Sequence, residues 1–272
     1  MKLYRSPGDP LPPLMVARLE REASRNWDRF YKAHAAGFFK DRHWLATEFP
    51  ELAPYEGSGD EPPRVFLEVG CGAGNTALPL AEMHPRSTVH ACDYAPRAVA
   101  LTNARAAAAG AAGRVSAFVA DVTTAPLLLP ANSVDVATLL FVLSACSPAT
   151  HAAAVRHVAA CLTPGGVILF RDYAAGDLAE ERLAAKDQKL GERFFARGDG
   201  TRCFYFGTAE LVALFAAEGC ACRRVVVHER DITNRAEETT SALRTRLYTR
   251  TDRMEATMDW LHRPFILSHL YN

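Results

Sequence analysis

The stretch Leu67-Glu68-Val69-Gly70-Cys71-Gly72-Ala73-Gly74 decides the fold, because an apolar segment runs directly into three alternating glycines. Glycines at these positions let backbone amides approach a ligand without a Cβ in the way. A carboxylate, Asp93, follows 23 positions after Gly70, and a second, Asp121, ends the strand-like segment 114–121. An acid at the tip of the second strand is placed to bind ribose hydroxyls. This spacing predicts a pocket for an adenosine-bearing cofactor.

The glycine loop also indicates which cofactor is bound. A dinucleotide fingerprint has a further glycine at the sixth position, where a helix N-terminus meets a pyrophosphate, but here Gly74 is followed by Asn75. Glu68, two residues before Gly70, is typical of enzymes that bind S-adenosylmethionine, which carries no phosphate. We therefore favour an S-adenosylmethionine-dependent methyltransferase over a nicotinamide-dependent oxidoreductase, and over a glycine turn that binds no ligand.

The bulk composition fits one α/β domain with additions. The chain has 272 residues, of which 49% are hydrophobic and 23% charged, and its net formal charge is zero. A chain of this size buries its own core. Lys and Arg exceed Asp and Glu by nine to six in residues 1–50 and by nine to seven in 223–272. Basic ends favour a polyanionic partner, although so small an imbalance is also found in proteins without one.

The cysteines and histidines indicate neither a disulfide framework nor a metal site. The seven cysteines form no C-x-x-C pair, and the nine histidines show no H-x-x-x-H or H-E-x-x-H spacing. No apolar run approaches the length of a membrane span, and residues 1–14 contain prolines in place of a signal-peptide core. We expect a reduced, metal-free protein of the cytoplasm, with a nuclear fraction also compatible.

Strand and helix patterns alternate from residue 64 onward. Strands are predicted at 65–69, 88–92, 115–119, 134–141, 166–171 and 222–228, and helices at 76–84, 96–109, 149–161 and 208–218. The alternation predicts an α/β, Rossmann-like class I methyltransferase fold, a mostly parallel sheet with helices on both faces. Ligands then bind at the carboxyl ends of the strands. Residues 229–272 show no clean alternation, so no seventh strand is recognised.

Two further segments flank and interrupt this domain. Leu19, Ala23, Trp27, Phe30 and Tyr31 recur at helical spacing, which predicts an N-terminal helical cap. Asp199-Gly200 favours a tight turn within the aromatic segment 194–206, which predicts an inserted hairpin or lid. Its aromatic rings form either a small core or a substrate platform. The expected domains are a disordered N-terminus (1–13), the cap (14–63), the methyltransferase domain (64–235) and a divergent C-terminal tail (236–272).

These segments resemble the tRNA N3-methylcytidine methyltransferase family, within the methyltransferase-like proteins. The most particular matches are Phe38-Phe39-Lys40-Asp41-Arg42-His43-Trp44-Leu45 and Arg197-Gly198-Asp199-Gly200-Thr201-Arg202. The other matches are Asn26-Trp27-Asp28-Arg29-Phe30-Tyr31, Glu48-Phe49, Glu51-Leu52, Glu68-Val69-Gly70-Cys71-Gly72, Ala91-Cys92-Asp93-Tyr94-Ala95-Pro96-Arg97-Ala98, Phe141-Val142-Leu143-Ser144-Ala145 and Leu169-Phe170-Arg171-Asp172-Tyr173. The resemblance fades after Arg235.

The resemblance implies an enzyme that forms 3-methylcytidine in the anticodon loop of tRNA with S-adenosylmethionine. It implies serine or threonine tRNAs as acceptors and seryl-tRNA synthetase as a candidate partner, with no membrane or DNA partner. It also implies that the cofactor is bound by Trp27, Tyr31, Gly70, Gly72, Asp93, Asp121, Val122 and Leu140. From spacing alone Trp27 and Tyr31 share a helix face and are equally well explained as core residues.

The chemistry of this reaction needs no general base, because N3 of neutral cytosine already carries a lone pair. The enzyme has to supply proximity, in-line aim and an unpaired base held by stacking. Positive charge moves onto the base, so a carboxylate at the strand ends would stabilise the product. We predict Asp172 as this catalytic carboxylate, with Tyr173 or an aromatic residue of 194–206 as the stacking partner. A structural ion pair between Arg171 and Asp172 is the alternative.

RNA contacts are predicted for basic and aromatic residues, because Arg and Trp combine charge with a stacking surface. They are Lys40, Arg42, His43, Trp44, Arg171 and Arg202. The alternative for His43 and Trp44 is a buried structural pair. Two other function classes stay open at this point, a small-molecule methyltransferase and a partner-dependent or non-catalytic tRNA-binding subunit.

Overall fold

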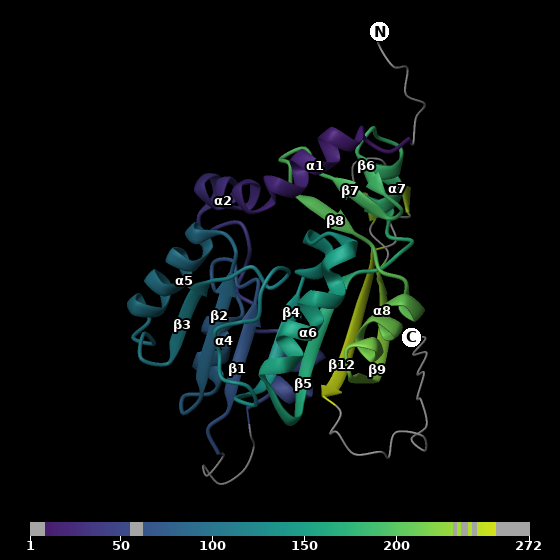
Figure 1. The fold of residues 1–272 in the computed structure, drawn as a ribbon. Coiled ribbons are helices and arrows are strands. Elements are labelled where there is room, and N and C mark those ends of the chain that lie inside the picture. Colours follow the sequence, from purple (N-terminus) through teal and green to yellow (C-terminus); the bar gives the residue numbers. More distant parts are fainter. Residues whose placement is uncertain (1–8, 55–61, 231–232, 235–238, 241–243, 254–272) are drawn as a thin grey trace.

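The computed structural model describes residues 9–54, 62–230, 233–234, 239–240 and 244–253. Its centre is a seven-stranded sheet with the strand order β3-β2-β1-β4-β5-β12-β9 (Figure 1). The strands are β1 (Val65–Val69), β2 (Thr88–Asp93), β3 (Val115–Val119), β4 (Val134–Leu140), β5 (Leu162–Tyr173), β9 (Cys220–Arg230) and β12 (Arg244–Arg253). The first five pair in parallel. The predicted Rossmann-like fold is confirmed.

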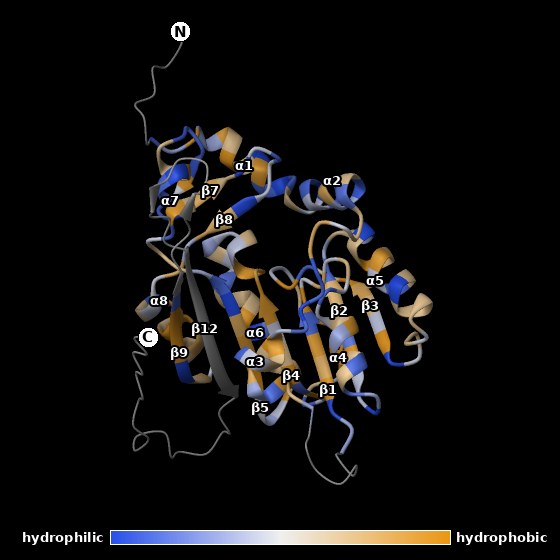
Figure 2. Ribbon diagram, turned by 180° about the vertical axis from the view of Figure 1, so that it is seen from behind, coloured by the Kyte–Doolittle hydropathy of each residue, from blue (hydrophilic) through white to orange (hydrophobic). Residues whose placement is uncertain are grey.

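Helices cover both faces of the sheet. The helices that follow its strands are α4 (Ala77–Met83), α5 (Pro96–Ala108), α6 (His151–Cys161) and α8 (Thr208–Ala217). Successive residues of a strand point to opposite faces, so Leu67 and Val69 of β1 join the core beneath α6 and α8, while Phe66 joins the core beneath α4. Apolar residues accordingly dominate the central strands (Figure 2).

The strand β12 corrects the expectation from the sequence, which recognised no seventh strand after residue 228. β12 pairs antiparallel with both β5 and β9 and fills the gap between them. Its segment, Arg-Thr-Arg-Leu-Tyr-Thr-Arg-Thr-Asp-Arg, is too polar to show the usual apolar signal. The strand is nevertheless possible because backbone pairing on two sides satisfies its amide and carbonyl groups.

The N-terminal segment forms two helices where the spacing predicted one. α1 (Pro13–Arg21) ends at Glu22, whose φ of −92° and ψ of 3° break the helical path, and α2 (Ala23–His34) continues in a new direction. Both lie across the carboxyl ends of the parallel strands (Figure 1). The short α3 (Leu45–Glu48) and the 3₁₀ turn η1 (Pro50–Leu52) then lead back toward the sheet.

The insertion after β5 contains α7 (Leu178–Ala184) and a separate sheet of β6 (Lys189–Gly191), β7 (Phe194–Ala196) and β8 (Arg202–Phe204). The predicted hairpin is present, since β7 and β8 pair antiparallel across the turn 197–201. The aromatic rings, for which the sequence allows a small core or a substrate platform, are buried: Phe195, Phe204, Tyr205 and Phe206 are at most 3% exposed. Phe195 and Tyr205 form a small core with Cys203, and Phe204 and Phe206 join the main core of the domain.

Among the described helices, none combines the length and the apolar character needed to cross a bilayer. In the same part of the chain, His, Cys, Asp and Glu side chains do not gather in threes as metal ligands do.

Candidate active site

The glycine loop after β1 adopts a backbone that only glycine tolerates without strain. Gly70, Gly72 and Gly74 have φ values of +65°, +56° and +78°, the left-handed region in which a Cβ clashes. A Cβ on Gly70 would lie 2.5 Å from Cγ2 of Val142, and one on Gly72 would lie 2.5 Å from the hydroxyl of Tyr31. The loop therefore brings its backbone against two other parts of the site.

Asp93 ties this loop to the end of β2. Its side chain is buried, with Oδ2 accepting a hydrogen bond from the Gly72 amide at 3.0 Å and Oδ1 accepting one from the Ala95 amide at 2.9 Å. Burial raises the pKa of Asp93 to about 6, although the amide donors oppose the shift. A carboxylate has about four lone-pair sites, so these two bonds leave acceptor capacity for ribose hydroxyls.

Glu68 anchors the other end of the loop. The residue is 1% exposed, and its Oε2 accepts a hydrogen bond from the Ala77 amide, at the first turn of α4, at 2.7 Å. Nη1 of Arg42 lies 3.8 Å from its Oε1, which has no hydrogen-bond partner within the described chain. Burial raises the pKa of Glu68 to about 7. Glu68 therefore joins the end of β1 to the start of α4 beneath the loop.

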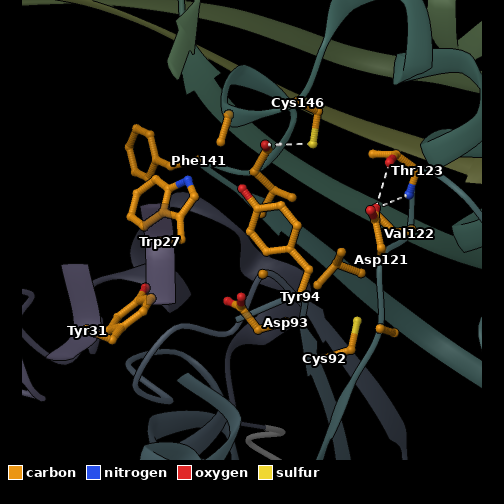
Figure 3. A pocket seen from close by; sticks show the side chains of 15 residues that line it. Trp27, Tyr31, Cys92, Asp93, Tyr94, Asp121, Val122, Thr123, Phe141 and Cys146 are labelled. Atoms are coloured by element: carbon orange, nitrogen blue, oxygen red, sulfur yellow. Dashed lines mark hydrogen bonds between the residues drawn. The ribbon is translucent and has the colours of Figure 1, made fainter. Parts of the chain in front are cut away.

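A pocket with about 530 Å³ of empty space, part of it open to solvent, lies over the ends of β1, β2 and β4. In Figure 3, Trp27 and Tyr31 of α2 lie on one side and Asp121, Val122 and Thr123 on the other. Its lining comprises Trp27, Tyr31, Val69, Gly70, Cys92, Asp93, Tyr94, Ala120, Asp121, Val122, Thr123, Phe141, Val142, Ala145 and Cys146.

Six of the eight residues predicted to bind the cofactor line this one pocket. The exceptions are Gly72, which lies beneath Tyr31, and Leu140, which is 2% exposed and belongs to the core beneath α4. Leu140 ends β4, and strand alternation directs it away from the pocket. The next residue, Phe141, lines the pocket instead.

Phe141 and Tyr94 are the main lining residues that the sequence analysis did not select. Both directly follow a strand end, at β4 and β2, and that position is the signal that identifies them. Phe141 has a φ of +62°, which costs a bulky residue conformational energy and is characteristic of functional sites. Its amide donates to the Arg171 carbonyl at 2.8 Å, which holds this backbone in place.

Helix α2 closes one side of the pocket and is held there by polar contacts. The rings of Trp27 and Tyr31 stack with centroids 6.1 Å apart. Ser24 donates to the Tyr94 carbonyl at 2.7 Å, and Asn26 donates to the Gly200 carbonyl, in the hairpin turn, at 2.8 Å. The insertion therefore positions the helix that covers the pocket.

Asp172, the predicted catalytic carboxylate, does not reach this pocket. It is fully buried, where Oδ2 accepts from the Ser144 amide at 2.9 Å and Oδ1 accepts from the Tyr173 amide at 3.0 Å. Burial raises its pKa to about 6. Strand alternation explains the position, because Asp172 points to the face of β5 opposite Arg171. Its contacts assign it to positioning the loop 143–145, whose last residue, Ala145, lines the pocket.

The outer side of Phe141 belongs to a second group of residues, Trp44, Glu48, Phe141, Arg171 and Tyr173, which we call the aromatic–arginine patch. The Arg171 guanidinium lies 4.1 Å from the Trp44 ring centroid and 5.6 Å from that of Phe141. Its Nη1 donates to Oε2 of Glu48 at 2.7 Å. The ring of Tyr173 lies 5.3 Å from that of Phe141. Phe141 thus joins the patch to the pocket.

The residues predicted to contact RNA differ in how far they are exposed. Lys40, His43 and Trp44 are exposed, Trp44 by 38%. Arg42 is half-buried, donates to Thr76 Oγ1 at 3.0 Å and lies 5.8 Å from the Phe141 centroid. His43 and Trp44 are therefore not a buried pair.

Arg202 requires a correction, because it is only 4% exposed. Its guanidinium pairs with Glu20 of α1 and donates to the Ala145 carbonyl at 3.1 Å. An arginine buried in this way has no surface to offer a phosphate. It links α1 and β8 to the loop beside the pocket.

Comparisons with known proteins agree with this geometry. A family model described as "Methyltransferase domain" matches residues 66–166. The tRNA N(3)-cytidine methyltransferase METTL6 of Rattus norvegicus is 42% identical over 213 residues, which cover 74% of this chain and 70% of that protein. The tRNA N(3)-methylcytidine methyltransferase trm141 of Schizosaccharomyces pombe is 35% identical, covering 77% of this chain and 84% of that protein.

Solved structures show the same fold at low sequence identity. The 1,6-didemethyltoxoflavin-N1-methyltransferase of Burkholderia thailandensis superimposes with a TM-score of 0.57 at 17% identity. The superposition covers 91% of this chain and 93% of that one.

Proposed function

The chain belongs to the tRNA N(3)-cytidine methyltransferase family, and from this premise we propose that it methylates N3 of a cytidine in tRNA, within the anticodon loop. The reaction uses S-adenosylmethionine, which supplies an electrophilic methyl group when bound. The observation that carries the proposal is a pocket at the strand ends, bordered by an aromatic and cationic patch, on a chain 42% identical to a member of this family.

The residues of the pocket fit the cofactor. Gly70 and Gly72 let the loop backbone lie directly against Val142 and Tyr31, and the buried Asp93 keeps acceptor capacity beside them. We assign Asp93 to the ribose hydroxyls, and Asp121 and Val122 to the nucleobase. Trp27 and Tyr31 cover the pocket from α2 and exclude water. A water-poor site strengthens each of these polar contacts.

The acceptor base is proposed to bind at the aromatic–arginine patch. Such a base has to leave its stack, and aromatic and guanidinium surfaces compensate for the stacking that it loses. Phe141 contributes to both the pocket and the patch, so a base at the patch lies next to the bound cofactor. No side chain has to remove a proton from N3 before attack, so the work of the protein is to position the base.

Helix α2 presents opposite faces to the cofactor and to the proposed RNA. Trp27 and Tyr31 face the pocket, while Arg25, Arg29 and Lys32 lie on the opposite side and are exposed. These three residues have i, i+4 and i+7 spacing and so form one basic face of the helix. Exposed cations bind phosphates without reading sequence. We assign this face, with Lys40 and His43, to the tRNA backbone.

Serine or threonine tRNAs are proposed as acceptors, with seryl-tRNA synthetase as a partner. The support for these finer assignments is the resemblance in residues 38–45 and 197–202. A cytoplasmic location is proposed with them. All seven cysteines are free and six of them are buried, as suits a reducing compartment.

The test is direct. Purified protein is incubated with methyl-labelled S-adenosylmethionine and unmodified serine or threonine tRNA, with and without cell extract, and the nucleosides are then separated. We expect labelled 3-methylcytidine that disappears when the tRNA is first digested with ribonuclease. If 3-methylcytidine is absent under both conditions, the proposal is wrong. Label in a ribonuclease-resistant small product would indicate a small-molecule methyltransferase instead.

A further inference from the structure

The patch contains one carboxylate, that of Glu48, which is paired with Arg171. We propose that Glu48, oriented by Arg171, accepts a hydrogen bond from the exocyclic amino group of the acceptor cytosine and so determines the specificity for cytosine. This inference rests on the proposed function and assigns the group that selects the base.

The position of Glu48 supports this role. It is the last residue of α3, and its Oε2 accepts from Arg171 at 2.7 Å. Its side chain is 27% exposed and that of Arg171 is 14% exposed, so the pair is partly desolvated but accessible. The stacking of Arg171 on Trp44 and its approach to Phe141 restrict the guanidinium, and hence the carboxylate bound to it.

The hydrogen-bonding groups of the pair match the edge of cytosine. On either side of N3, cytosine presents an acceptor, O2, and a donor, the N4 amino group. Arg171 is a donor and Glu48 an acceptor, and a carboxylate can accept from an arginine and from an amino group together. Contacts to O2 and N4 leave N3 free to attack. Uracil presents O4 where cytosine has its amino group, and a carboxylate repels this oxygen.

The same contact meets the electrostatic requirement of the reaction. Methylation of N3 leaves a positive charge that is shared with the N4 amino group, and a carboxylate at N4 stabilises this charge as it develops. The sequence assigned this task to Asp172, which is committed to the Ser144 and Tyr173 amides. Glu48 supplies a carboxylate on the patch, on the opposite face of β5.

The test compares two acceptors that differ only in the amino group. Full-length tRNA is assembled by ligation with either cytidine or a pyrimidin-2-one ribonucleoside, which lacks N4 but keeps the N3 lone pair, at the target position. Both kcat/KM values are measured for the wild type, Glu48→Ala and Glu48→Gln. The intrinsic reactivities of the two bases are the same for every variant, so a change in the ratio of the two values reports the contact to N4.

We expect the wild type to prefer cytidine by about 100-fold or more, because a site built to bind an N–H group rejects a substrate that lacks it. In Glu48→Ala this ratio should fall at least about 10-fold, mainly through loss of activity on cytidine. Glu48→Gln, which keeps an acceptor oxygen, should give an intermediate ratio. Cofactor affinity, measured by calorimetry, should stay unchanged in both variants.

Glu218→Ala is the matched control, because Glu218 accepts from Arg156 at 2.8 Å in a comparable ion pair remote from the pocket. It should leave the ratio unaltered. If both Glu48 variants lose activity equally on the two acceptors, Glu48 is only structural and the inference is overturned. If the wild type methylates neither acceptor nor natural tRNA while it binds cofactor, the proposed function fails first, and the inference fails with it.

Discussion

The cofactor pocket and the aromatic–arginine patch share Phe141 but are built in different ways. The pocket takes most of its residues from positions that directly follow the parallel strands, and its polar atoms are bonded to backbone amides. The patch joins side chains of α3 and of Trp44 just before it, of β5, and of the residue after β4, through stacking and one ion pair. The first region depends on backbone geometry and the second on side-chain packing, so substitutions should separate them.

The largest expected effect on cofactor affinity comes from a substitution that disturbs the backbone of the pocket. In Gly70→Ala the new Cβ would meet Val142 at 2.5 Å with φ at +65°, so the loop or Val142 has to move. We expect cofactor affinity to fall about 100-fold or more, which corresponds to about 2.7 kcal/mol. Calorimetry with S-adenosylhomocysteine measures this.

Gly110→Ala is the matched control for this substitution. Gly110 also has a positive φ, +67°, but a Cβ there would meet nothing within 4 Å. This variant shares the backbone strain and should bind the cofactor like the wild type. Equal losses in the two variants would mean that strain, and not the contact with Val142, explains the effect.

A second prediction concerns pH and Asp172, which lies beneath both regions. Burial raises its pKa from 3.8 to about 6 in the folded state. Between these values the folded protein binds more protons than the unfolded chain, so this group makes the protein less stable as the pH rises from about 4 to 6. Asp172→Asn has no such charge to bury. Its unfolding free energy relative to the wild type should therefore rise across this range, by up to about 3 kcal/mol.

Chemical denaturation at several pH values measures this difference. Asp187→Asn serves as the control for the substitution itself, since Asp187 is exposed and the change removes no buried charge. A flat profile for Asp172→Asn would contradict the raised pKa. Cofactor affinity is a separate readout, and its loss in Asp172→Asn would show that the loop 143–145 has moved.

The same contrast explains what the sequence could predict. Gly70, Asp93 and Asp121 are recognisable because a parallel sheet places the residues after its strands at one edge. Glu48 is not, since its role depends on how α3 packs against β5. The prediction that Arg202 contacts RNA is wrong for the same reason. The residues around it in the sequence do not show that its guanidinium is buried and paired with Glu20. The strand β12 was missed because its pairing depends on β5 and β9 and not on its own apolar pattern.

A third prediction compares one tryptophan from each region. Trp27 lines the pocket, and Trp44 stacks on Arg171 in the patch. Trp44→Ala should lower kcat/KM for tRNA about 10-fold, in the range of one lost stacking contact, and leave cofactor affinity unchanged. Trp27→Ala should weaken cofactor binding, measured by calorimetry. If the two effects are reversed, Trp44 belongs to the cofactor site and the division into two regions is wrong.

The smallest expected effect tests whether the basic face of α2 extends the patch toward the tRNA backbone. Arg25→Glu replaces an exposed cation opposite Trp27 and Tyr31, so it should raise KM for tRNA about 3- to 10-fold without changing cofactor affinity. It should also reduce the slope of log KM against log salt concentration, because each phosphate contact contributes to that slope. Arg86→Glu, an exposed arginine just before β2 at the opposite end of the sheet, is the charge-matched control and should change neither quantity. An effect of equal size in both variants would reduce the role of α2 to the net charge of the protein, and RNA recognition would then rest on the patch alone.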